Sequence, residues 1–274
     1  MTAASDQALA EVALRASRRG AEAIAREVAR ARSAGTDIDK RSKDGESDFV
    51  TSADLAAERE ILATLASERP ADAVLAEESG EAVAGTSGYR WLVDPLDGTM
   101  NFVHHRIDYA VSVGVDAIGQ AYPGEQSVAG AVLIPQLGWE FAASATGDLV
   151  TASLPLQTSG VSVLKRAMVG VGYPRGDEPR ALAHAWLGDL LPDVRDYRRM
   201  GSAACDLVSI ATGALDVYIA FGVQPWDVGA GFSLVRAAGG RAGWVQARTG
   251  RQVAVATSAD LFEQVTERVV ASAF

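Results

Sequence analysis

The spacing of hydrophobic residues changes repeatedly between the helical and the strand period along this chain. Between residues 5 and 34, apolar side chains recur at three- and four-residue steps with Arg and Glu between them. This spacing predicts one long helix that begins at Ser5 or Asp6 and ends at Gly35. A second helix is predicted after Thr51 and before Pro70. Later helices are expected at residues 180–191, 201–213, 225–239 and 259–270.

Short apolar runs between these helices predict the strands. They lie at residues 73–76, 91–94, 109–115, 128–134, 139–143, 167–171, 194–200, 215–221 and 253–256. Because strands and helices interleave throughout, the pattern predicts an α/β or layered α+β fold. We expect two closely packed lobes. Residues 1–150 would form an N-terminal lobe that carries most of the site, and residues 151–274 a C-terminal lobe that completes it.

Composition and charge exclude several classes of function. With 48% hydrophobic and 22% charged residues in 274, the chain is typical of a globular protein. A net charge of −10 disfavours nucleic-acid binding, which depends on clustered Lys and Arg. The single cysteine, Cys205, cannot form an internal disulfide, which fits a reducing compartment. With no apolar leader and no apolar run of the ~18–20 residues that span a bilayer, we expect a cytoplasmic protein without a membrane partner.

The most informative chemistry lies between Trp91 and Phe102. An apolar run ends in Asp94, a proline follows, and Asp97 then precedes Gly98 and Thr99, which predicts a strand, a turn and a helix start. Two carboxylates would therefore lie beside the unpaired N–H groups of a helix end, where anions bind. This combination favours a divalent cation that brings a phosphate with it.

Three more acids are candidates for the same cleft. Glu77 ends the strand at residues 73–76, Asp227 lies in a glycine-containing helix start, and Asp54 follows Thr51 by three residues. Each also has a structural alternative. Glu77 could belong to a solvated turn, and Asp54 could simply complete a capping box with Thr51.

Five acids in one cleft would raise one another's pKa unless cations compensate them. A site of carboxylate and carbonyl oxygens without Cys or His suits Mg²⁺, which also binds substrate phosphate. Two such ions ~3.5–4 Å apart could hold the attacking water and the leaving oxygen on opposite sides of phosphorus. The residues themselves thus favour a phosphatase.

Two segments carry a resemblance to a known family. Asp94-Pro95-Leu96-Asp97-Gly98-Thr99 with Asn101-Phe102 resembles the first signature of the inositol monophosphatase family. Trp226-Asp227-Val228-Gly229-Ala230-Gly231 with Ala238-Gly239-Gly240 resembles the second. The segment from Asp48 to Asp54 and the run Glu77-Glu78-Ser79 are similar to two further family blocks, in the same order.

The resemblance implies a fructose-1,6-bisphosphatase-like fold of alternating helix and sheet layers, in a lithium-sensitive, Mg²⁺-dependent phosphomonoesterase that forms a homodimer. Two to three ions are implied. Their ligands would be Glu77, Asp94, the carbonyl of Leu96, Asp97 and Asp227. Thr99 and Asp54 would activate the attacking water, with Glu77 holding a further ion beside it. The amides of Gly98 and Thr99, the backbone at Ala203, and Lys43 would contact phosphate or substrate.

One departure leaves the substrate open. Family members that grip inositol carry an acid six residues before the tryptophan of the second signature, and this chain has Ala220 there. The substrate could therefore be an inositol, sugar or polyol phosphate, or alternatively histidinol phosphate or a 3′-phosphoadenosine nucleotide. A regulatory protein that keeps the fold and binds a macromolecular partner is the non-enzyme alternative.

Overall fold

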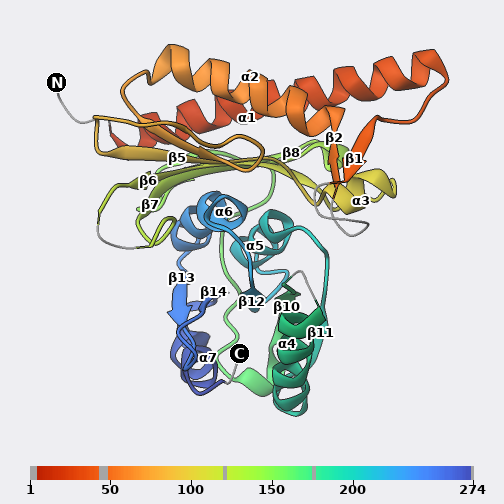
Figure 1. Cartoon of the computed structure of the whole chain (residues 1–274). Coiled ribbons are helices and arrows are strands. Elements are labelled where there is room, and N and C mark those ends of the chain that lie inside the picture. Colours follow the sequence, from red (N-terminus) through yellow and green to blue (C-terminus); the bar gives the residue numbers. More distant parts are fainter. Residues whose placement is uncertain (1–4, 43–48, 120–121, 175–176, 273–274) are drawn as a thin grey trace.

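Helices and sheets alternate in layers in the computed structural model, which describes residues 5–42, 49–119, 122–174 and 177–272 (Figure 1). From one side to the other lie a helix pair, a seven-stranded sheet, a second helix pair, a five-stranded sheet and a third helix pair. This confirms the predicted layered α+β class. The division into lobes near residue 150 stays a prediction.

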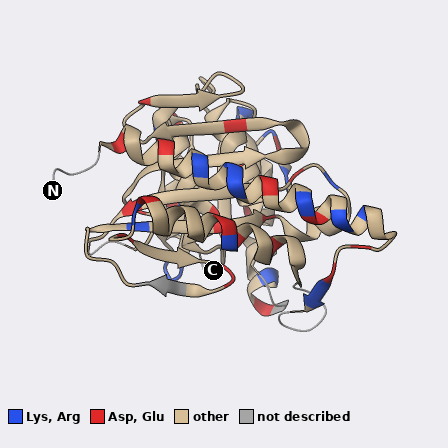
Figure 2. Cartoon of the chain, turned by 90° about the horizontal axis from the view of Figure 1, so that it is seen from above, with Lys and Arg blue, Asp and Glu red and all other residues tan. Residues whose placement is uncertain are grey.

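The outer helix pair consists of α1 (Asp6–Ala34) and α2 (Ser52–Glu68). Ser5 caps α1 through its side chain, and Gly35 ends it at φ 66°, as the sequence predicts. The apolar face of α1 is buried with Ile61 and Leu65 of α2 against the sheet. On the outer side, basic and acidic residues alternate along the helices (Figure 2), and Arg15 pairs with Glu68 across the two.

The seven-stranded sheet has the order β4-β3-β5-β6-β7-β8-β9. Its strands are β3 (Ala73–Ala76), β4 (Gly80–Val83), β5 (Tyr89–Asp97), β6 (Ala110–Ala117), β7 (Ser127–Ile134), β8 (Trp139–Ser144) and β9 (Leu149–Ala152). Neighbours are antiparallel except β3 and β5, which run in parallel. Glu77 and Asp94, which follow the paired residues Ala76 and Val93, are thereby brought side by side.

The middle helix layer contains α5 (Ala203–Ala211) and α6 (Pro225–Ala237). Glycines let α6 approach the first sheet closely: a Cβ on Gly114 would lie 2.6 Å from the backbone nitrogen of Ala230. One apolar cluster joins α5 and α6 with residues of both sheets, including Phe141 and Tyr218. Both helix starts are consequently held between the sheets.

The five-stranded sheet has the order β11-β10-β12-β14-β13. Its strands are β10 (Met168–Gly172), β11 (Asp196–Arg198), β12 (Val217–Phe221), β13 (Arg241–Gln246) and β14 (Gln252–Thr257). Strand β10 runs parallel to β11 and β12, whereas β14 runs antiparallel to β12 and β13. Helices α4 (Asp177–Leu190) and α7 (Phe262–Val270) cover its outer face (Figure 1).

Several elements differ from the sequence prediction. Strands β4, β9 and β13 were not predicted, and neither was the short antiparallel pair β1 (Lys40–Ser42) and β2 (Phe49–Thr51). The strand predicted at residues 194–200 is observed only at Asp196–Arg198, where its three residues are exposed at the sheet edge. The described residues contain no helix long and apolar enough to cross a membrane.

Candidate metal and phosphate site

The end of β5 is distorted where the two signature acids lie. The register of β5 against β6 shifts between Asp94 and Asp97, and the Asp94 carboxylate accepts a hydrogen bond of 3.0 Å from the Leu96 amide. The strand thus continues through Pro95 to Asp97, beyond its predicted end at Asp94. Gly98 then adopts φ 91° as the N-cap of α3 (Thr99–Val103), a conformation that favours glycine. The predicted strand, turn and helix start are present, with a bulge in place of a clean strand end.

Glu77 and Asp94 lie together at this edge. The Glu77 amide donates to the Val93 carbonyl at 3.0 Å, which fixes Glu77 beside the next residue of β5. Asp94 is only 2% exposed. Burial raises the pKa of Asp94 well above its usual range, and the charges of Glu77, Asp97 and Asp227 raise it further. Three of the predicted acids therefore lie close enough to the fourth, Asp94, for their charges to raise its pKa.

Asp97 connects this edge to the start of α5. Its Oδ2 accepts hydrogen bonds from Ser202 Oγ at 2.7 Å and from the Ala204 amide at 2.6 Å. Burial raises the pKa of Asp97 to about 6 despite these bonds, and the charge of Glu77 adds to the rise. Backbone amides at the start of α5, including that of Ala203, are thus directed toward Asp97.

Asp54 makes both of the contacts that the sequence left as alternatives. The Thr51 amide donates to Asp54 Oδ2 at 2.9 Å, the Thr51 hydroxyl contacts the same oxygen, and together they complete the capping box of α2. Thr99 Oγ1 lies 3.1 Å from Asp54 Oδ1 and 3.2 Å from the Leu96 carbonyl oxygen. Desolvation raises the pKa of Asp54 to about 6. One carboxylate thus caps a helix and also contacts Thr99.

Asp227 belongs to α6, in the helix layer between the two sheets. It is the third residue of α6, and its Oδ2 accepts a hydrogen bond of 2.7 Å from the Gln224 amide. The Trp226 carbonyl lies 3.4 Å from Ser112 Oγ on β6, the strand beside β5. Because Ser112 pairs with Asp94 in the sheet, the start of α6 lies next to the strand pair that carries Asp94.

The donor chemistry of this cluster fits a hard cation. The charges that raise the pKa of Asp94 all belong to carboxylates, so a positive ion would relieve them. No group of three or more His, Cys, Asp or Glu side chains within the described ranges is already arranged to hold an ion. One carboxylate oxygen of Asp97 and one of Asp227 accept hydrogen bonds from protein donors.

Two contacts near the site were not predicted. Ser202 donates a hydrogen bond to Asp97 and caps α5, and its place just before a predicted helix was the signal for a capping role. Asn101 Nδ2 donates to the carbonyls of Asp108 at 2.6 Å and Met200 at 2.8 Å, which ties α3 to the segment before α5. Lys43 lies outside the described residues.

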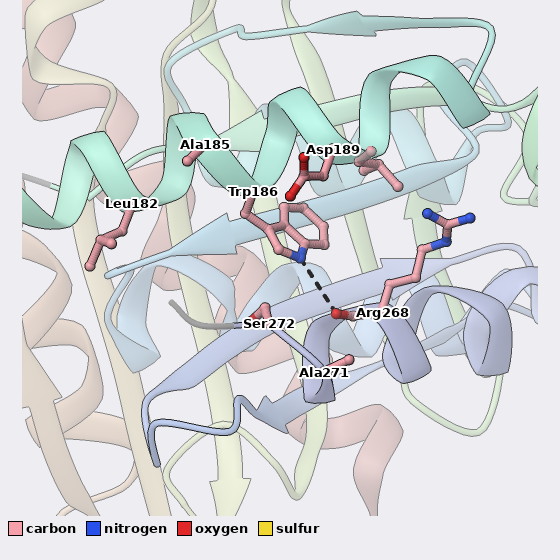
Figure 3. Close-up of a pocket in the computed structure, with 8 residues that line it drawn as sticks. Leu182, Ala185, Trp186, Asp189, Arg268, Ala271 and Ser272 are labelled. Atoms are coloured by element: carbon pink, nitrogen blue, oxygen red, sulfur yellow. Dashed lines mark hydrogen bonds between the residues drawn. The ribbon is translucent and has the colours of Figure 1, made fainter.

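A separate pocket of about 410 Å³ lies on the outer face of the second sheet, between α4 and the end of α7 (Figure 3). Its lining consists of Leu182, Ala185, Trp186, Asp189, Leu190, Arg268, Ala271 and Ser272. Trp186 Nε1 donates to the Arg268 carbonyl at 3.4 Å. The lining is mostly apolar and contains none of the acids of the cluster, so this pocket is separate from the candidate metal and phosphate site.

Comparisons with known proteins show which family and fold this chain resembles. The model of the inositol monophosphatase family matches residues 5–272. An inositol-1-monophosphatase of Mycobacterium leprae is 38% identical over 240 residues, covering 80% of each chain. The Nus factor SuhB of Escherichia coli is 34% identical over 230 residues, covering 84% of this chain and 82% of that protein. The crystal structure of the suppressor protein SuhB from Bartonella henselae superposes with a TM-score of 0.80 at 26% identity, over 96% of this chain and 98% of the other.

Proposed function

The chain belongs to the inositol monophosphatase family, and from that premise we propose that it is a Mg²⁺-dependent phosphatase that hydrolyses a small phosphomonoester with water. The observation that carries the proposal is the gathering of carboxylates around Asp94, which lies beside Glu77 across β3 and β5, close to the contact between Thr99 and Asp54. Such a cluster costs stability unless a cation offsets its charge, and arrangements of this kind are typical of functional sites.

The residues that would hold two to three ions are Glu77, Asp94, the Leu96 carbonyl, Asp97 and Asp227. When bound, Mg²⁺ supplies positive charge that offsets the carboxylates and the substrate phosphate and favours ionisation of water. The chain itself provides oxygen ligands only, which is the set that Mg²⁺ prefers.

Thr99 and Asp54 are the proposed proton acceptors. A water molecule that attacks phosphorus would give its proton to Thr99 Oγ1, while the Thr99 proton passes to Asp54 Oδ1, 3.1 Å away. With a pKa of about 6, Asp54 is mostly ionised at neutral pH and can accept that proton. The phosphorus–oxygen ester bond breaks as the new bond forms, and the leaving alkoxide takes a proton from solvent.

The amides of Gly98 and Thr99 are the proposed phosphate contacts. They lie in the first turn of α3, where N–H groups have no partner within the helix. Because α3 has only five residues, these individual donors matter more than the helix dipole. They lie beside Asp97 and Thr99, so phosphate would meet the activated water there.

The test is phosphate release from a panel of inositol, sugar, polyol and nucleoside phosphates, with Mg²⁺ or with EDTA. We expect turnover that requires Mg²⁺ and a loss of at least a hundredfold in Asp94→Asn. Glu263→Gln, which changes an exposed acid paired with Arg241, serves as the matched control and should keep wild-type activity. Failure to hydrolyse any substrate at millimolar Mg²⁺ would refute the enzyme.

A second candidate, favoured by the relatives named Nus factor, is a regulatory protein that keeps the fold and binds a macromolecular partner. The two roles need not exclude each other. Homodimer formation in a reducing, cytoplasmic setting, without nucleic-acid or membrane partners, is the proposed state of the enzyme. Light scattering would test it, and a monomer mass at micromolar concentration would contradict it.

A further inference from the structure

Glu58 is a buried acid of α2 that the proposed mechanism does not use. Its side chain is 5% exposed, and it forms no ion pair with any residue that the structure describes. A buried carboxylate without a cation is costly unless hydrogen-bond donors satisfy it. The donor here is the backbone amide of Glu78, which lies 2.9 Å from Glu58 Oε2 and 20 residues further along the chain. Glu58 therefore connects α2 to the turn that carries Glu77.

The turn at residues 77–79 joins the antiparallel strands β3 and β4. The amide of Glu77 donates to the Val93 carbonyl at 3.0 Å, which continues the pairing of β3 with β5 by one residue. The next amide, that of Glu78, leaves the sheet and donates to Glu58 instead. Connections between strands are ordinarily more mobile than the strands they join. The bond to Glu58 thus ties this turn to a helix in the layer above the sheet.

The two hydrogen bonds fix the backbone on both sides of Glu77. Each peptide unit is planar, so the direction of a side chain depends on the two dihedral angles between the flanking planes. The bond to Val93 holds the plane before Glu77, and the bond to Glu58 holds the plane after it. After burial, the charge of Glu77 is the largest contribution to the raised pKa of Asp94. The Glu77 carboxylate is therefore held beside Asp94.

Glu58 lies on the same buried face of α2 as Asp54, about one helical turn further along. Asp54 Oδ1 lies 3.1 Å from Thr99 Oγ1, where the proposed proton transfer takes place. Desolvation raises the pKa of Asp54, and the charge of Glu77 adds to the rise. One helix face thus carries both the proposed proton acceptor and the support of a proposed metal ligand. Their relative positions are set together by the packing of α2.

We propose that Glu58 is a positioning residue of the metal site, which holds Glu77 in its Mg²⁺-binding orientation through the Glu78 amide. Hydrogen-bond partners that orient metal ligands typically contribute about 10–100-fold to metal affinity. Glu58 acts through the backbone and not as a ligand, so an uncharged side chain with the same acceptor oxygen can replace it. The inference rests on the proposed function, because it takes Glu77 as a ligand of Mg²⁺.

The experiment is calorimetric titration of Mg²⁺ into the metal-free full chain. Glu58→Met keeps the volume of the buried side chain and removes the acceptor, and we expect it to raise the Mg²⁺ dissociation constant about tenfold. Glu58→Gln keeps an acceptor oxygen and should stay close to the wild type. Glu77→Gln should weaken binding by itself, and adding Glu58→Met to it should weaken binding no further, because the two residues act as one unit.

Two further measurements follow the same variants. Amide hydrogen exchange in the metal-free protein, resolved by NMR, reports the bond itself, and exchange at Glu78 should be slow in the wild type and in Glu58→Gln but faster in Glu58→Met. In assays of phosphate release, Glu58→Met should need about tenfold more Mg²⁺ for half-maximal activity, with kcat at saturating Mg²⁺ close to the wild type.

Two variants of α2 serve as controls. Glu60→Ala removes a more exposed acid that pairs with Arg26, and it should leave Mg²⁺ binding unchanged. Ile61→Val weakens the packing of the same helix at a fully buried position. It should lower Tm without changing the Mg²⁺ dissociation constant, which separates positioning from a general loss of stability.

The outcomes separate this inference from the proposed function. Mg²⁺-dependent hydrolysis with an unchanged Mg²⁺ dissociation constant in Glu58→Met overturns the role of Glu58 and leaves the phosphatase intact. Equal losses of Mg²⁺ affinity in Glu58→Gln and Glu58→Met, further weakening in the double variant, or the same loss in Ile61→Val also overturn it. Mg²⁺ binding that weakens in Glu58→Met and recovers in Glu58→Gln, in a protein that hydrolyses no phosphate ester, supports the role of Glu58 and overturns the phosphatase.

Discussion

Removal of divalent metal should make the stability of this protein fall as pH rises, and the size of the fall can be worked from two buried acids. The pKa of Asp54 and that of Asp97 each rise from 3.8 to about 6 in the fold. Each rise corresponds to about 3 kcal/mol of unfolding free energy. Below pH 4 both groups are protonated in the folded and unfolded states, and no cost arises. Between pH 4 and 6 the folded state binds more protons than the unfolded state, so stability declines as pH rises.

The assay is thermal unfolding in EDTA, followed by circular dichroism from pH 4.5 to 7.5, and repeated with 5 mM Mg²⁺. A loss of several kcal/mol across this range lowers Tm by about 2–4 °C per kcal/mol in a chain of this size. Mg²⁺ should restore Tm at pH 7.5 because it binds the ionised acids of the folded state. Asp97→Asn should flatten the decline in EDTA and reduce the effect of Mg²⁺. A Tm in EDTA that stays level or rises between pH 4.5 and 6.5 would refute the reasoning.

Three substitutions test single contacts. Thr99→Ala removes the hydroxyl that contacts Asp54, so we expect kcat to fall about 10²–10⁴-fold with little change in Tm. Thr99→Ser retains a hydroxyl and should keep most of the activity. Stopped assays of phosphate release measure the activity of both variants. Ser202→Ala removes a helix cap and a bond to Asp97, and should lower the free energy of unfolding by about 1–3 kcal/mol, measured in urea. Gly98→Ala places a Cβ 2.9 Å from the Asp108 carbonyl at φ 91° and should cost more than about 1 kcal/mol, measured in the same way.

Matched controls separate the causes. Gly250→Ala has a similar φ of 87° and no atom within 4 Å of the new Cβ, so it isolates the backbone strain from the clash at Gly98. Ser5→Ala removes an exposed helix cap of α1, which is the matched control for Ser202. Equal losses in Ser5→Ala and Ser202→Ala would contradict a stabilising contact with Asp97 beyond capping.

The sequence predicted the layered fold, and it singled out acids that the structure brings near Asp94, because both leave strong local patterns. The spacing of apolar residues in α1 and its end at Gly35 were visible without tertiary information. The acids at residues 94 and 97 stood out because a proline and a glycine framed them. The local sequence pattern was therefore sufficient to predict α1 and the segment that carries the two acids.

The unpredicted elements depend on tertiary contacts. Strand β13 begins at Arg241 straight after a helix and becomes a strand by pairing with β14, a partner further along the chain. The bulge between Asp94 and Asp97 follows from pairing with β6, which no local pattern encodes. The dual contact of Asp54 needed α3 to meet α2, because its partner Thr99 lies 45 positions further along the chain.

The central claim is that the carboxylates around Asp94 form a Mg²⁺ site used for phosphate ester hydrolysis. The most direct measurement is calorimetric titration of Mg²⁺ into the metal-free protein, paired with phosphate release over the same Mg²⁺ concentrations. The account predicts saturable binding and activity that rise together in the wild type, with both lost in Asp94→Asn while Glu263→Gln retains them. Activity that persists in EDTA, or in an Asp94→Asn protein that no longer binds Mg²⁺, would contradict it.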